Sequence, residues 1–172
     1  PGHSYGRYAG STWFADEFGL DLDENCIAQV NCDSPGCRWA TSYERMMWMS
    51  EANDFCVEAI RDAVGQTSAG TRPLRAGDYS FNNIGITSFF MLSSTMPDEL
   101  LKEKGYYAVG GCGGNIDWHT ETDTIEVADL DILVKDIRVY ITAVFRAINA
   151  TVHPFNFVNT ANEFIHTIKS YQ

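Results

Sequence analysis

With 172 residues, of which 45% are apolar and 13% aromatic, the chain has the length and composition of one folded domain and not of a disordered segment. Its formal net charge of −11 argues against a nucleic-acid partner, because binding to a phosphate backbone requires a basic surface. No apolar run approaches the roughly 18 residues that a membrane-spanning helix needs, so we expect no membrane span.

The start of the chain and its cysteines bear on where the protein resides. It opens with PGHSYGRYAG, without an initiator Met or a basic-then-apolar signal segment, and we expect it to be cut from a longer protein. None of the five cysteines forms a C-x2-C pair, which disfavours a structural zinc knuckle. We therefore expect reduced, mostly buried thiols in a cytoplasmic protein, with a secreted protein or ectodomain as the alternative.

The first half of the chain predicts two helices separated by a strand. Residues 6–18 predict a helix that ends near Gly19, a residue typical of helix ends. Residues 25–33 are a short apolar run that ends in Asp33 and predicts a buried strand. Residues 34–50 support no clear prediction. Residues 52–65 predict a helix that starts at Asn53 or Asp54 and ends at Gly65.

The second half predicts one strand and up to three helices. After a loop rich in Gly, Ser, Thr and Pro, the apolar run 86–92 predicts an interior strand, and 96–105 a short helix or turn. Residues 157–170 predict a final helix. The longest element, 128–150, is predicted to be an amphipathic helix because its apolar residues recur at spacings of three and four: Leu130, Leu133, Val134, Ile137, Ile141, Val144, Phe145 and Ile148.

Strands that alternate with helices predict an α/β fold, a three-layer sandwich with a mostly parallel central sheet. Only two or three strands are evident, however, and a buried parallel sheet usually has more. We therefore expect residues 1–172 to be the C-terminal half of one domain. The remaining strands would come from upstream sequence or from a second chain.

Three side chains near predicted strand ends are candidates for chemistry: Asp33, Asp78 and His119. Each has an ordinary alternative, since an Asp at a strand end often forms a turn or cap and a single His is often a surface group. Trp118 is likewise more often a core residue than a substrate platform. Together, two carboxylates and an imidazole are the ligand types that a divalent metal ion binds.

Four segments, in the same order, resemble the M28 zinc-peptidase family. They are PGHSYGRYAGSTWFAD, AQVNCDSPG, AGDYSFNNIGITSFFML and WHTETDTIEVADLD. GSTWFAD and NCDS resemble most the branch of the transferrin receptor and the glutamate carboxypeptidases. The resemblance implies a zinc aminopeptidase-type hydrolase with one or two zinc ions.

Carried over residue by residue, the resemblance makes Asp33 a ligand of one zinc ion and His119 a ligand of the other. It places Asp78 at an acidic position near the site, as a candidate catalytic residue. The general-base and ligand glutamates of the family fall at His3 and Ser4, so both are replaced. His3 would then assist proton transfer, since imidazole titrates near neutral pH, whereas serine is a poor zinc ligand. The loop Gly110–Asn115, with Gly113 and Asn115, would shape the substrate pocket together with Trp118.

Three hypotheses remain open. The first is a metal-dependent hydrolase of peptide or amide bonds with a variant base. The second is a non-catalytic homologue that serves as a binding or dimerisation domain, which the loss of both glutamates favours. The third is non-hydrolytic chemistry of the glutaminyl-cyclase kind, which the missing ligand glutamate disfavours. We favour the first, acting on a peptide or a small amide. We also expect a second chain or upstream segment that completes the fold, and the chain could form a homo-oligomer.

Overall fold

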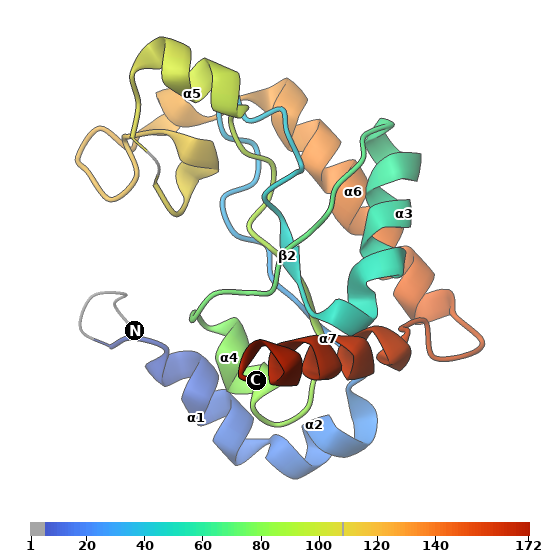
Figure 1. The fold of residues 1–172 in the computed structure, drawn as a ribbon. Coiled ribbons are helices and arrows are strands. Elements are labelled where there is room, and N and C mark those ends of the chain that lie inside the picture. Colours follow the sequence, from blue (N-terminus) through green and yellow to red (C-terminus); the bar gives the residue numbers. More distant parts are fainter. Residues whose placement is uncertain (1–5, 108) are drawn as a thin grey trace.

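The computed structural model of the chain describes residues 6–107 and 109–172. About half of the chain is helical, and a small sheet lies near the centre (Figure 1). His3 and Ser4, the two positions where the family glutamates are replaced, lie outside the described residues.

The helices, strands and single turns of 3-10 helix (η) come in an order that mixes the three types. They are α1 (Ala9–Glu17), α2 (Gly19–Asn25), β1 (Gln29–Val30), β2 (Met47–Trp48), η1 (Ser50–Ala52), α3 (Asn53–Val64), α4 (Asp78–Asn82), β3 (Ser88–Met91), α5 (Asp98–Lys104), η2 (Cys112–Gly114), η3 (Ile125–Val127), α6 (Leu130–Asn149) and α7 (Phe157–Ser170).

The sheet has the strand order β1-β3-β2 and is mixed. β1 runs parallel to β3, with Val30 opposite Phe89, whereas β2 runs antiparallel to β3, with Trp48 also opposite Phe89. The three-layer sandwich with a mostly parallel central sheet, which the sequence predicts, is therefore wrong. Apolar runs alone do not fix strand length, and only two residues of the predicted strand 25–33 pair as a strand.

Helix ends follow the expected chemistry at several places. The Asp129 side chain caps α6 by accepting a hydrogen bond from the Ile132 N–H at 3.0 Å, and Asn156 caps α7 in the same way. Gly65 ends α3 with a left-handed φ of 71°, which a residue without Cβ adopts without strain. The predictions for α3, α6 and α7 are thus confirmed. The helix end predicted at Gly19 falls between α1 and a second helix, α2, that begins at this residue.

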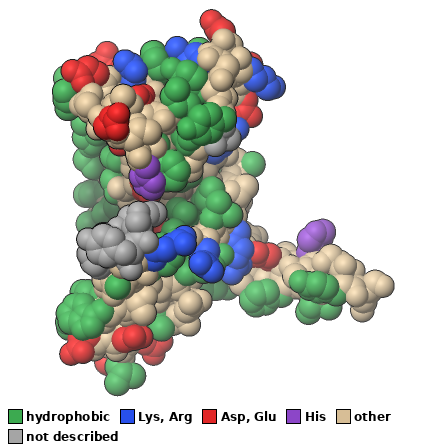
Figure 2. Space-filling view, turned by 90° about the vertical axis from the view of Figure 1, so that its left-hand side faces the viewer, with side chains coloured by type: hydrophobic (Ala, Val, Ile, Leu, Met, Phe, Trp, Pro, Cys, Tyr) green, Lys and Arg blue, Asp and Glu red, His purple; other side chains and the backbone are tan. Residues whose placement is uncertain are grey.

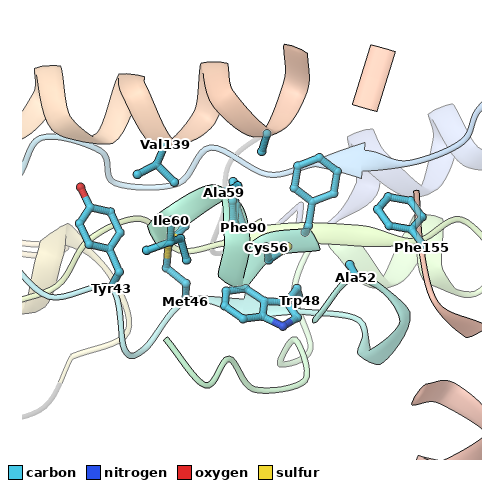
Figure 3. Packing of buried hydrophobic residues seen from close by; sticks show 12 residues of the cluster. Tyr43, Met46, Trp48, Ala52, Cys56, Ala59, Ile60, Phe90, Val139 and Phe155 are labelled. Carbon is cyan, nitrogen blue, oxygen red and sulfur yellow. The ribbon is translucent and has the colours of Figure 1, made fainter. Parts of the chain in front are cut away.

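The core lies between α3, α6 and the sheet, where α3 and α6 run side by side (Figure 1). Val139 of α6 faces Cys56, Ala59 and Ile60 of α3, and all four are fully buried (Figure 3). From β3, Phe89 and Phe90 fill the space beneath them. Their rings pack edge to face with centroids 5.2 Å apart, an arrangement that stabilises aromatic pairs beyond simple burial.

α6 has two apolar faces. The inner face (Ile132, Val139, Ala143 and Ala147) is buried together with Asp136. The outer face, defined as Leu130, Val134, Ile137, Ile141, Val144, Phe145 and Ile148, is exposed, with Ile141 at 61% and Phe145 at 63%. These residues recur at spacings of three and four and form one stripe along the helix.

Other surfaces are also rich in apolar groups. No residue of α7 is buried, and Phe164 and Ile168 are more than half exposed. Figure 2 shows hydrophobic side chains at the surface among charged ones on another face of the molecule. Within the described residues, none of the helices combines the length and the apolar character that crossing a membrane would require.

Candidate functional site

Two of the predicted site residues, Asp33 and Asp78, lie in segments that a hydrogen bond joins. Because β1 and β3 are parallel, the segments that follow them, with Asp33 and Ser93, leave the same end of the sheet. Asn31 and Asp33 follow β1, and Asp78 is the first residue of α4, which precedes β3. The Asn31 Nδ2 donates a hydrogen bond to the Asp78 Oδ2 at 2.8 Å. The structure thus joins the segment of Asp33 to Asp78 over 47 residues of sequence.

Asp78 is a buried carboxylate with spare bonding capacity. It is 1% exposed, and its Oδ1 has no hydrogen-bond partner within the described part of the chain. Burial raises the pKa of Asp78, the hydrogen bond from Asn31 opposes the rise, and the negative charge of Asp33 adds to it. A buried oxygen without a partner is costly, so it points to a ligand or to a group outside the described residues.

Asp33, in contrast, presents its carboxylate to solvent while its backbone is held in place. Its carbonyl oxygen accepts hydrogen bonds from the Ser93 N–H at 3.1 Å and from the Ser93 hydroxyl at 2.8 Å. Its Oδ1 accepts from the Ser34 hydroxyl at 2.8 Å. Ser93, after β3, therefore holds the backbone of Asp33, and Ser34 orients its carboxylate.

The glycine-rich loop Gly110–Asn115 connects Asp33 to the histidine. The Ser34 hydroxyl that binds Asp33 also accepts a hydrogen bond from the Cys112 N–H at 2.9 Å. A Cβ built on Gly111 would lie 2.4 Å from the Trp118 Nε1, so Trp118 packs directly against the loop. His119 stacks on Trp118 with ring centroids 3.9 Å apart. Ser34 thus joins the segment of Asp33 to the glycine-rich loop, and Trp118, which follows this loop in sequence, packs back against it beside His119.

His119 has an unusual backbone. Its φ is 63°, in the left-handed region, where Asn, Asp and His are enriched among the residues other than Gly. Its side chain is exposed. The stacking on Trp118 gives the imidazole a defined orientation.

A largely apolar pocket of about 310 Å³ lies beside these segments. Its walls include Ser34 and four glycines of the loop, Gly110, Gly111, Gly113 and Gly114. Its apolar lining is contributed by the end of β3, β2 and α5: Met47, Met91, Leu92, Met96 and Leu101. The sequence analysis named the glycine-rich loop as a pocket wall, which remains a prediction for substrate, and it did not name the apolar residues. Nothing in the spacing of these apolar residues shows that they meet.

The residues that the structure describes supply only part of a metal site. Asp33 and His119 are a carboxylate and an imidazole, which zinc binds readily. Among the described residues, however, no three His, Cys, Asp or Glu side chains gather closely enough to hold an ion. A metal ion bound by Asp33 or by His119 would therefore need further protein ligands from outside residues 6–107 and 109–172.

We compared the chain with known proteins. No family model, curated protein or solved structure matches it. The M28 resemblance therefore rests on the four quoted segments alone, and it remains a prediction.

The predicted substrate-binding residues occupy different places. Gly113 lines the pocket. Asn115 is fully buried, and its Nδ2 donates to the Arg38 and Cys112 carbonyls at 3.0 and 2.9 Å, so the amide N–H groups are engaged in holding the loop. Trp118 supports the loop from behind. Substrate binding by these three residues remains a prediction.

Proposed function

We propose that the chain is part of a metal-dependent hydrolase of peptide or amide bonds, in which Asp33 and His119 supply metal ligands. One observation carries this proposal: the apolar pocket is walled by the residue next to Asp33 and by the loop that leads to His119. A binding pocket beside a carboxylate and an imidazole is the combination that a hydrolytic site of this kind needs.

The metal would polarise the scissile carbonyl and lower the pKa of a bound water. The chain's own residues have separate tasks. The pocket would take an apolar side chain of the substrate, since Met91, Leu92 and Met96 line it. Asp78 would orient the Asn31–Asp33 segment through its hydrogen bond and hold a proton more readily than an ordinary aspartate, because burial raises its pKa. We therefore favour substrates with a hydrophobic residue beside the scissile bond.

Two parts of the proposal concern groups outside the described residues. His3 would assist proton transfer in place of the family glutamate. The remaining metal ligands, for one or two zinc ions, would come from upstream sequence or from a second chain. β1 lies at one edge of the sheet, paired only with β3, so an added strand has a place to bind.

Metal content tests the proposal directly. The native assembly, with any completing chain, is analysed by inductively coupled plasma mass spectrometry. Asp33→Ala and His119→Ala should each lower bound zinc at least tenfold. His166→Ala is the matched control, because His166 is an exposed histidine on α7, and it should keep the zinc of the unmodified chain. Equal zinc in all four proteins, or none in the unmodified assembly, would reject Asp33 and His119 as ligands.

A second function, a non-catalytic binding or dimerisation domain, is favoured by the outer face of α6. Seven exposed apolar residues lie along one side of this helix, and contiguous exposed apolar patches often mark interaction surfaces. Such a domain would bind a partner or a second copy through this face without any zinc. Absence of metal together with concentration-dependent association would favour this function over hydrolysis.

A further inference from the structure

Two buried thiols face each other behind the wall of the pocket. The Cys37 Sγ donates to the Cys112 Sγ at a distance of 3.9 Å, although the residues are 75 positions apart in the sequence. Both residues are buried, with 7% and 6% of their surface exposed. Neither thiol has a role in the proposed hydrolysis.

The backbones around the two thiols are already close. A Cβ built on Gly113 would lie 2.6 Å from the Cys37 Cβ, so the loop that carries Cys112 passes directly over the Cys37 side chain. The hydrogen bond from the Cys112 N–H to the Ser34 hydroxyl ties the two segments together. A disulfide needs Cβ atoms about 3.8 Å apart and sulfurs about 2.05 Å apart. The sulfurs, 3.9 Å apart, therefore need to approach by about 2 Å for the bond to form.

We propose that Cys37 and Cys112 form a reversible disulfide by exchange with a small disulfide such as oxidised glutathione. One protein thiol loses its proton to solvent and attacks the reagent, whose S–S bond breaks and releases one molecule of reduced glutathione. The second protein thiol then attacks the mixed disulfide and releases the second molecule. The protein loses two hydrogen atoms, and the reagent is reduced to two thiols.

The bond would fix one part of the pocket wall. Cys37 follows the turn that contains Asp33 and Ser34, and Cys112 lies within Gly110–Asn115. Ser34, Gly111 and Gly113 all line the pocket, so a link between Cys37 and Cys112 joins both of these wall segments covalently. Formation of the disulfide would restrict the movement of the glycine-rich loop. Reduction would restore it.

The environment of the thiols makes this exchange slow. Burial raises the pKa of Cys37, and the neighbouring Cys112 adds to the rise. Burial and the nearby Asp123 carboxylate raise the pKa of Cys112. Both groups are thus mostly protonated at neutral pH, and the thiolate is the attacking species. The pair would respond to a sustained change of redox poise and not to a brief one.

Peptide mapping tests the link. The full chain is incubated with oxidised glutathione, unfolded, alkylated with iodoacetamide and digested without reductant. We expect a peptide pair that contains Cys37 and Cys112, lighter by two hydrogen atoms than the sum of the free peptides and abolished by dithiothreitol. Cys37→Ser and Cys112→Ser should each remove it, whereas Cys32→Ser, at an exposed thiol, should not.

The result that would overturn the proposal is alkylation of both Cys37 and Cys112 while glutathione is found only on Cys26 and Cys32. Hydrogen exchange tests the consequence in the unmodified chain, without a variant. Amides of residues 109–115 should exchange several-fold more slowly in the oxidised than in the reduced protein. Equal exchange would show that the link, even if formed, does not restrain the loop.

Discussion

The Tyr43 hydroxyl donates a hydrogen bond to the Asp136 Oδ1 at 2.9 Å, across 93 residues of sequence. The Asp136 Oδ2 accepts from the Gly36 N–H at 2.7 Å and from the Ser94 hydroxyl at 2.9 Å. Asp136 is fully buried, and Figure 3 shows the Tyr43 oxygen directed toward α6. One carboxylate of α6 therefore fixes the turn after Asp33, the residues after β3 and the loop before β2.

Removing the Tyr43 hydroxyl should destabilise the fold. Tyr43→Phe keeps the ring in the core but removes the hydroxyl that donates to the Asp136 Oδ1. We expect a loss of about 1–3 kcal/mol in the free energy of unfolding, the usual cost of a buried acceptor left unsatisfied. Urea unfolding followed by circular dichroism measures it. Tyr79→Phe is the control, because its hydroxyl donates to the Pro73 carbonyl over a longer 3.2 Å, and the loss should stay below about 1 kcal/mol.

Asp136 also predicts a pH dependence. Burial raises the pKa of Asp136 despite its three donors, so the folded state holds this proton more tightly than the unfolded state does. Its contribution to stability is then greatest below the unfolded pKa of about 3.9 and is lost as pH rises through the raised pKa of the folded state. Relative to the unmodified chain, Asp136→Asn should gain stability as pH rises through this window and then level off.

Urea midpoints of the two proteins, measured at intervals from about pH 4 to neutral pH, give this difference. If the stability of Asp136→Asn relative to the unmodified chain stays constant over the whole range, the carboxyl group of Asp136 titrates alike in the folded and unfolded states. If this relative stability falls with rising pH, the hydrogen bonds to Asp136 outweigh burial and lower its pKa.

The glycine-rich loop gives a steric prediction for the position of His119. Gly111→Ala should displace Trp118, since its Cβ would lie 2.4 Å from the indole nitrogen, and with it the stacked His119. Overpacking of this kind costs about 1–3 kcal/mol. Zinc affinity of the assembly should fall, and tryptophan fluorescence should shift. The φ of Gly111 is −162°, ordinary extended backbone, so the effect is one of space and not of backbone strain.

Gly110→Ala is the matched control for this prediction. Its Cβ would lie 3.5 Å from Trp118, an ordinary van der Waals contact. Zinc affinity and fluorescence should therefore stay near those of the unmodified chain. If Gly111→Ala and Gly110→Ala change zinc affinity and fluorescence equally, the contact between residue 111 and Trp118 does not determine the position of His119.

The site shows what the sequence predicts and what it does not. The order of strand, acidic residue and glycine-rich loop pointed to Asp33 and His119. The structure links the segment of Asp33 to the glycine-rich loop through Ser34. Asp78 was expected just before a strand as a site candidate, with a turn residue as the alternative. It begins a five-residue helix and is buried, and its Oδ2 accepts a hydrogen bond from the Asn31 amide. Such contacts between distant segments carry no local signal, so sequence reasoning could not place them.

Periodicity also leaves open how a correctly predicted helix packs. Spacing predicted α6 correctly, and its apolar residues do lie on one stripe, Leu130 to Ile148. An apolar stripe normally faces the core. Here the core contacts a second face, around Val139 and Ala143. This face contains the buried Asp136 and small residues, so its side chains are less apolar than those of the exposed stripe. Periodicity identifies a helix but does not state which face is buried when both are apolar.

The outer face of α6 gives the last prediction. Phe145 is 63% exposed and Val139 is fully buried, although both are apolar residues of the same helix. Phe145→Lys should leave the free energy of unfolding within about 0.5 kcal/mol, as for most surface substitutions. It should also weaken self-association, measured by sedimentation velocity over a range of concentrations, because a charge enters the apolar patch. Val139→Ala should instead cost about 1–3 kcal/mol without changing association. If Phe145→Lys destabilises the chain as much as Val139→Ala does, the outer face is packed within the folded protein and is not a surface for a partner.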